Sequence, residues 1–106
     1  MLSDSTRQAV LAFVAGRDWA QFHSEENLAK SISIEAAELL ECYQWSGEAD
    51  PHRASAELAD VVTYCVLLAE RLGVDLDEIV LAKLSESATK YPVEKAKGVS
   101  TKYDEL

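Results

Sequence analysis

Hydrophobic residues recur every three or four positions along most of the chain, which is the spacing of one face of an α-helix. The pattern predicts four helices, over residues 5–17, 25–45, 51–72 and 76–90. No stretch alternates convincingly between apolar and polar residues as a strand would. Residues 93–106 show no helical period and are expected to form a tail, either a disordered end or an arm that folds over a site or a neighbouring chain. Four helices with short connections predict an all-α fold, a four-helix bundle in one domain.

Capping residues support these boundaries. Ser24 is the expected N-cap of the second helix, and Asp50 followed by Pro51 is the expected start of the third. Gly47 and Gly73 are expected C-terminal caps of those two helices. Asp75 opens the fourth helix in the same way that Ser24 opens the second.

The third helix is the most apolar of the four. From Leu58 to Ala69 its only clearly polar residues are Asp60 and Thr63. A helix that is apolar all round is a central one. This chain has more apolar surface than a lone small bundle can cover, so we expect a homo-oligomer, either a dimer or a tetramer.

Two acidic pairs interrupt the buried faces of the second and third helices. Glu35 and Glu38 form the first pair, and Glu57 and Asp60 form the second with the same spacing. Residues three apart are neighbours on a helix, so each pair presents two carboxylates on one face. No lysine or arginine lies within helical reach of Glu35 or Glu38, whereas Arg53 could pair with Glu57. Four carboxylates on apolar helices indicate a bound cation.

The chemistry of these acids favours magnesium. Mg²⁺ prefers oxygen ligands and usually shares them with water and substrate phosphates. Zinc is not expected, since Cys42 and Cys65 lack ligand spacing and His23 and His52 form no paired motif. The sequence also shows no nucleophile triad and no glycine-rich phosphate loop. The remaining option is attack on phosphorus by water, with a carboxylate as general base.

The composition limits which partners the protein is expected to bind and which compartment it is expected to occupy. The chain has 106 residues, 10 of them basic and 19 acidic, for a net charge of -9. This balance argues against a broad nucleic-acid or anionic-membrane surface, so a phosphate ligand would need metal ions. Both cysteines are expected to be reduced core residues. We see neither a signal peptide nor a membrane-spanning run and expect a cytoplasmic protein.

The acids and their flanking residues resemble a known family. Glu35-Ala36-Ala37-Glu38 followed by Glu57-Leu58-Ala59-Asp60 is similar to the metal-binding motif of the MazG-like all-α nucleotide pyrophosphohydrolases. Four flanking segments resemble the dCTP pyrophosphatase branch of that family: residues 17–23, 44–45, 91–93 and 102–106.

The resemblance implies Mg-dependent hydrolysis of nucleoside triphosphates between the α and β phosphates, with Mn²⁺ as a possible substitute. The products would be the monophosphate and pyrophosphate, and the role would be house-cleaning of the deoxynucleotide pool. The implied metal-binding and catalytic residues are Glu35, Glu38, Glu57 and Asp60. The implied contacts to base and sugar are His23, Asn27 and Trp45, and those to the phosphates are Tyr64, Lys83, Lys90 and Lys102.

The chain departs from the family pattern at two places. Ile34 stands where many relatives have a further glutamate, and Ser87 and Ala88 stand where polar or basic phosphate contacts are common. These departures motivate an alternative hypothesis, a helical module that binds nucleotides or a partner protein without turnover. Within the enzyme hypothesis, Glu38 is the preferred candidate for orienting the attacking water, because it lies at the edge of the apolar stripe. The preferred base, the number of metal ions and the oligomer size stay open.

Overall fold

The computed structural model describes residues 2–106, and the regular elements among them are helices. The elements are α1 (Asp4–Gly16), a 3₁₀ turn (Ala20–Phe22), α2 (Glu25–Glu41), α3 (Pro51–Leu72), α4 (Leu76–Lys90), α5 (Val93–Ala96) and a second 3₁₀ turn (Tyr103–Glu105). The expected all-α class is therefore confirmed. The chain divides into two compact units, Met1–Val74 and Asp75–Leu106. The expectation of one domain over the whole chain stays a prediction.

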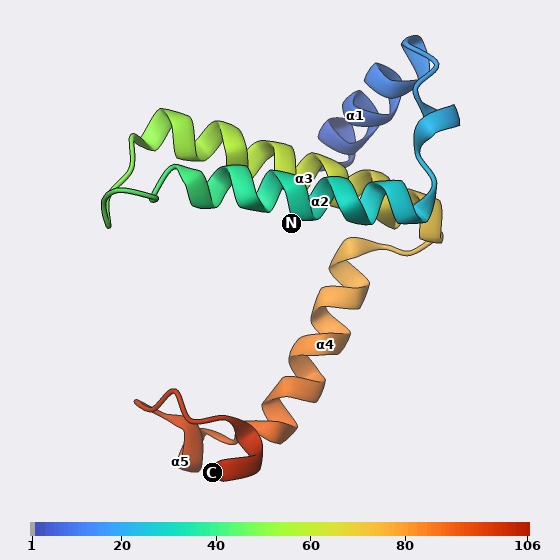
Figure 1. The fold of residues 1–106 in the computed structure, drawn as a ribbon. Coiled ribbons are helices and arrows are strands. Elements are labelled where there is room, and N and C mark those ends of the chain that lie inside the picture. Colours follow the sequence, from blue (N-terminus) through green and yellow to red (C-terminus); the bar gives the residue numbers. More distant parts are fainter. Residues whose placement is uncertain (1) are drawn as a thin grey trace. The chain divides into compact units, whose positions relative to one another are not determined.

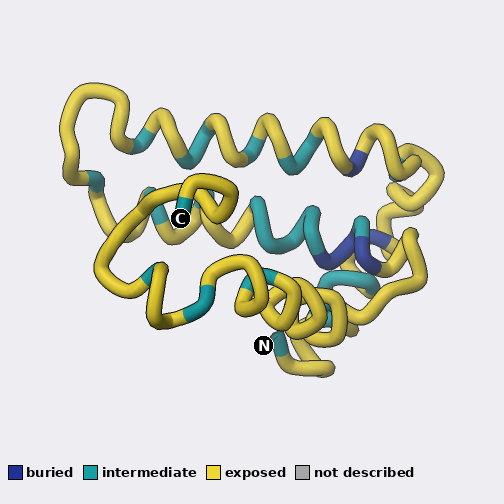
Figure 2. Tube along the Cα trace, turned by 90° about the horizontal axis from the view of Figure 1, so that it is seen from below, coloured by how far each residue is buried: buried dark blue, intermediate teal, exposed yellow. Residues whose placement is uncertain are grey.

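The first unit is built around an antiparallel pair of helices. Figure 1 shows α2 and α3 side by side and running in opposite directions, with α1 packed against α3. The core of this unit includes Val14 from α1, Leu28 from α2 and Leu67 from α3, and Val66 and Ala69 of α3 are also buried. Burial gathers toward the end where α2 begins and α3 ends (Figure 2). The middle of the α2–α3 pair is only partly buried and can carry polar groups.

Side-chain caps fix where the helices begin. The Ser24 hydroxyl accepts a hydrogen bond from the backbone N–H of Asn27 at 3.1 Å. Asp50 caps α3 in the same way, and Asp75 caps α4. Gly73 ends α3 with a φ of 69°, a left-handed conformation that favours glycine. These four boundaries confirm the predictions made from capping residues.

The prediction for the end of α2 was wrong. The helix ends at Glu41 rather than near residue 45, and Gly47 is not its cap. The N–H groups of Cys42 and Tyr43 bond to carbonyls three residues back, at 3.1 and 2.9 Å, so the last turn tightens. Beyond this point Trp45 is 90% exposed. Without an apolar contact to bury, these residues gain little from continuing the helix.

The tail also differs from the prediction. Its residues form α5 and a 3₁₀ turn rather than lacking helical structure. The ring of Tyr103 packs edge-on against Tyr91, with 6.0 Å between ring centroids. Elements this short contain about one turn, so they leave no hydrophobic period in the sequence. An aromatic contact, not amphipathic spacing, holds this end of the chain.

Large apolar side chains lie on the surface of the first unit. Ile34 is 58% exposed, Leu40 70% and Leu58 52%. A small domain gains stability by covering such residues with another surface. This exposure is consistent with a homo-oligomer, which stays a prediction.

We expect Leu28→Ala to lower the free energy of unfolding by about 2–5 kcal/mol, because it leaves a cavity in the centre of the core. Leu28 is 1% exposed. Urea denaturation followed by circular dichroism measures the loss. The control is Leu40→Ala in the same helix, which should cost much less. Equal losses for the two variants would contradict this description of the core.

Candidate functional site

Carboxylates from α2 and α3 meet where the two helices face each other. Glu35 on α2 and both Glu57 and Asp60 on α3 each place one oxygen so that all three lie within 4.8 Å of one another. Glu35 and Glu57 are half-buried and Asp60 is exposed. The i, i+3 spacing on α3 explains why its two acids share one face. The packing of α2 against α3 then brings them to Glu35.

Two oxygens in this cluster are buried without a partner. Oε2 of Glu35 and Oε2 of Glu57 accept no hydrogen bond from the described residues. A buried carboxylate oxygen without a hydrogen bond or a cation is costly. Hard divalent cations take carboxylate oxygens as ligands. The donor set and its two unpartnered oxygens therefore fit a Mg²⁺ or Mn²⁺ ion.

Glu38 lies beside this group of three rather than within it. The pKa of its carboxyl is raised, first by hydrogen bonding with the Glu35 carboxylate and then by the negative charge of Glu35. Hydrogen bonding with Glu57 acts in the opposite direction and partly offsets the rise. Glu38 therefore interacts with acids on both helices. The structure brings all four predicted acids together, and their separate roles stay predictions.

Arg53 does not remove the need for a cation at Glu57. The pKa of Glu57 is raised, first by burial and then by hydrogen bonding with Glu38 and by the charges of Glu38 and Asp60. The positive charge of Arg53 lowers this pKa, but it is the smallest of the causes. Repulsion and burial outweigh the local arginine.

His23 and Tyr64 form an aromatic pair. Their rings meet edge-on, with 6.5 Å between centroids and an interplanar angle of 78°. Tyr64 is one helical turn beyond Asp60, so it continues the acidic face of α3. Nδ1 of His23 is buried and has no hydrogen-bond partner among the described residues. Through Tyr64 this aromatic pair adjoins the acidic face of α3.

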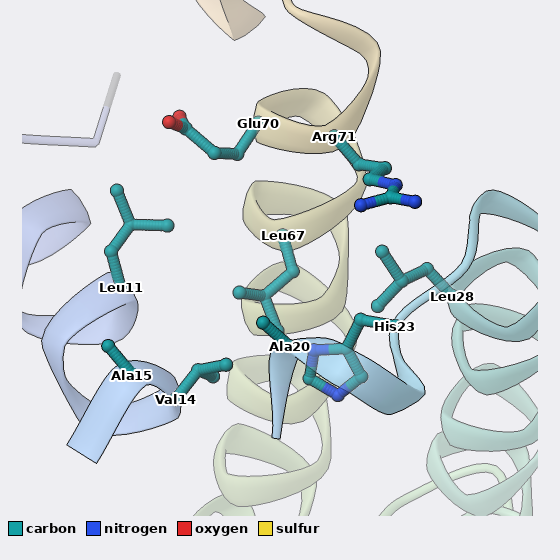
Figure 3. A pocket seen from close by; sticks show the side chains of 9 residues that line it. All are labelled: Leu11, Val14, Ala15, Ala20, His23, Leu28, Leu67, Glu70 and Arg71. Atoms are coloured by element: carbon teal, nitrogen blue, oxygen red, sulfur yellow. The ribbon is translucent and has the colours of Figure 1, made fainter. Parts of the chain in front are cut away.

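His23 also lines a cavity of about 380 Å³. Figure 3 shows its imidazole among side chains from the first three helices. The lining residues are Leu11, Val14, Ala15, Ala20, His23, Leu28, Leu67, Glu70 and Arg71. The walls are mostly apolar, with Glu70 and Arg71 as the charged members. An apolar cavity with a few polar groups is the usual form of a small-molecule pocket.

Asn27 and Trp45, the two other candidates for contacts to base and sugar, lie in different environments. The side-chain amide of Asn27 donates a hydrogen bond to the Phe22 carbonyl at 3.0 Å. This bond ties the 3₁₀ turn to the start of α2 and gives Asn27 a structural role. Trp45 lies beyond the end of α2 with 90% of its surface exposed. Contacts of either residue with a substrate stay predictions.

The three predicted phosphate-binding lysines belong to the second unit. Lys83 and Lys90 each pair with Glu86 across 3.5 Å on α4. Lys102 precedes the last 3₁₀ turn, where its carbonyl accepts a hydrogen bond from the Glu105 N–H. Sequence reasoning overlooked Glu86. Its spacing of three and four residues from the lysines was the signal that could have revealed it.

A comparison with known protein families identifies the family of this chain. A model described as the MazG-like family matches residues 30–106. The chain belongs to the MazG-like family. The predicted family is thus confirmed, and the matched residues of this MazG-like chain include the four acids.

Similar proteins support this family assignment. The rat protein dCTP pyrophosphatase 1 is 37% identical over 113 residues, which cover 97% of this chain and 66% of the rat protein. The human protein of the same name is 38% identical, with the same coverage. The MazG-like chain thus spans slightly less than two thirds of these relatives. A crystal structure of a pyrophosphatase from Archaeoglobus fulgidus matches with a TM-score of 0.77 and 33% identity, covering 84% of this chain and 91% of that one.

None of the helices in residues 2–106 is both long and apolar enough to cross a membrane.

We expect Glu57→Gln to raise the melting temperature of the metal-free protein. A carboxyl whose pKa is raised by folding binds its proton more tightly in the folded state, so the ionised group destabilises the fold. This penalty is fully present above the raised pKa and disappears as the pH falls through it. Thermal unfolding in EDTA at neutral and at mildly acidic pH measures the gain, which should shrink at the lower pH.

The control for this experiment is Glu48→Gln, which removes the same charge from an exposed loop position. It should leave the melting temperature nearly unchanged. A Glu57→Gln protein that is less stable than the wild type in EDTA at neutral pH would contradict the repulsion within the cluster.

Proposed function

We propose that this protein is a Mg-dependent nucleoside triphosphate pyrophosphohydrolase that cleaves between the α and β phosphates and releases pyrophosphate. The observation that carries the proposal is the meeting of Glu35, Glu57 and Asp60 within 4.8 Å, with two buried oxygens unpartnered. Membership of the MazG-like family supports it. The relatives named dCTP pyrophosphatase 1 suggest deoxynucleoside triphosphates, with dCTP as the first to test.

In this proposal Glu35, Glu57 and Asp60 hold the metal. The three carboxylates lie on two helices that already hold them close together. Little rearrangement is therefore needed when the ion binds. Bound Mg²⁺ would supply positive charge for the phosphate oxygens and would lower the pKa of a coordinated water. The acidic cluster alone would repel a polyphosphate, and the net charge of -9 adds to this repulsion, so the positive charge of the metal is needed at this cluster.

Glu38 is the proposed general base. The Glu35 and Glu57 carboxylates both affect its pKa, although it does not belong to the group of three. A raised pKa brings a carboxylate closer to the pKa of an effective base near neutral pH. Its carboxylate would orient the attacking water and take one of its protons. Because Ile34 supplies no further carboxylate next to Glu35, this role falls to Glu38.

The remaining candidates would bind the substrate. His23 offers its unpartnered Nδ1 and Tyr64 its ring next to the acids, so these two are the best-supported contacts. Asn27 and Trp45 are further proposed contacts to base and sugar. Lys83, Lys90 and Lys102 would meet the phosphates, some of them donated by another chain of a homo-oligomer. We propose a cytoplasmic role in cleaning the nucleotide pool.

Asp60→Asn should reduce kcat/KM by roughly 10²–10³, the usual effect of removing one electrostatic group from a catalytic site. Activity is measured as pyrophosphate released from a panel of nucleoside and deoxynucleoside triphosphates with Mg²⁺. Glu48→Gln is the matched control and should keep full activity. Release of inorganic phosphate alone, or full activity in Asp60→Asn, would refute the proposal. Tight nucleotide binding with intact substrate would instead favour the non-catalytic binding module.

Metal binding can be tested without substrate. We expect Mg²⁺ to raise the melting temperature of the wild-type protein, because the ion binds the folded cluster and neutralises its charges. Chelation with EDTA should reverse the shift. In Glu57→Gln the response should be much smaller, since one ligand is lost. An equal Mg²⁺ shift in the two proteins would show that the ion binds elsewhere.

A further inference from the structure

One carboxylate on α4 pairs with two lysines. Oε2 of Glu86 lies 3.5 Å from Nζ of Lys83, and Oε1 lies 3.5 Å from Nζ of Lys90. The spacings of three and four residues put all three side chains on one face of the helix. Each oxygen therefore serves one ammonium group, so the carboxylate occupies the space between two cations.

The end of the chain contributes to this arrangement. Nζ of Lys90 lies 4.7 Å from the centroid of the Tyr103 ring, a distance typical of a cation–π contact. Tyr103 in turn packs edge-on against Tyr91, which directly follows α4. In Figure 1 the last turn of the chain lies beside the end of α4. Lys90 is therefore held from two sides, by Glu86 and by Tyr103.

The Glu86 carboxylate lies at a point of positive electrostatic potential. The pKa of Glu86 is lowered, first by the charge of Lys83 and then by that of Lys90, which shows that both cations act on this point. A phosphate group offers more negative charge and more acceptor oxygens than a carboxylate. An anion of that kind can therefore compete with Glu86 for the same two ammonium groups.

We propose that Glu86 is an internal competitor that occupies the Lys83–Lys90 anion site in the free protein and sets its affinity for the phosphate chain of the substrate. This inference rests on the proposed function, in which the two lysines contact phosphates. Glu86 is a positioning residue, because it acts through the lysines and not on the reacting atoms. Highly charged polyphosphates displace it readily, whereas an anion of low charge does so poorly.

The test uses inorganic tripolyphosphate as the probe and the full chain in EDTA at low salt. Isothermal titration calorimetry should show roughly three- to tenfold tighter binding by Glu86→Gln than by the wild type, the size expected for losing two exposed ion pairs. The gain should fall as salt is added, because exposed charges are screened. Lys90→Met combined with Glu86→Gln should abolish it.

The matched control is Glu94→Gln, which removes the same charge from α5, where no ion pair of Glu94 is found among residues 2–106. Circular dichroism confirms that each variant is folded. Equal binding by the Glu86→Gln and Glu94→Gln variants, weaker binding by Glu86→Gln, or no binding by any variant would overturn the inference. The probe and the absence of metal separate this result from nucleotide hydrolysis. A Glu86→Gln gain in a protein that cleaves no nucleotide would refute the proposed function alone.

Discussion

Repulsion among the acids between α2 and α3 is the constraint on which the site depends. Packing these helices together brings Glu35, Glu57 and Asp60 within 4.8 Å, and within residues 2–106 their charge is not fully compensated. Apolar packing offsets the free-energy cost of this repulsion. It lies at one end of the same helix pair, where Leu28 and Leu67 form part of the core. Separating the apolar core from the charged middle allows the fold to hold acids together without relying on them for stability.

The first unit contains a cluster of negative side chains, and the second contains a pair of positive ones. The first unit gathers carboxylates, which Arg53 offsets only weakly among residues 2–74, so it is suited to take a cation from solution. The second unit gathers Lys83 and Lys90 and supplies its own anion in Glu86. In the proposed function, a metal completes the first site, whereas the second site releases its internal partner when it binds phosphate. The proposed hydrolysis of a phosphoanhydride would use both kinds of charge.

Where the sequence predictions were wrong, the missing information was tertiary. The apolar period of α2 continues past Glu41, but the helix stops there, and Trp45 is left 90% exposed. The tail contains helical turns, and Tyr103 packs against Tyr91, a contact between residues twelve positions apart. Periodicity reports which face of a helix is apolar. It does not report whether another element will bury that face.

The sequence by itself determined the all-α class, most helix boundaries, the four acids and the family, because these depend on spacing and on local caps such as Ser24, Asp50 and Asp75. Only the tertiary structure decided that Glu35 joins Glu57 and Asp60 while Glu38 stands beside them. It also decided which carboxylate oxygens are left without partners. Helical spacing fixes neighbours within one helix, whereas the distances between side chains on two helices depend on how those helices pack.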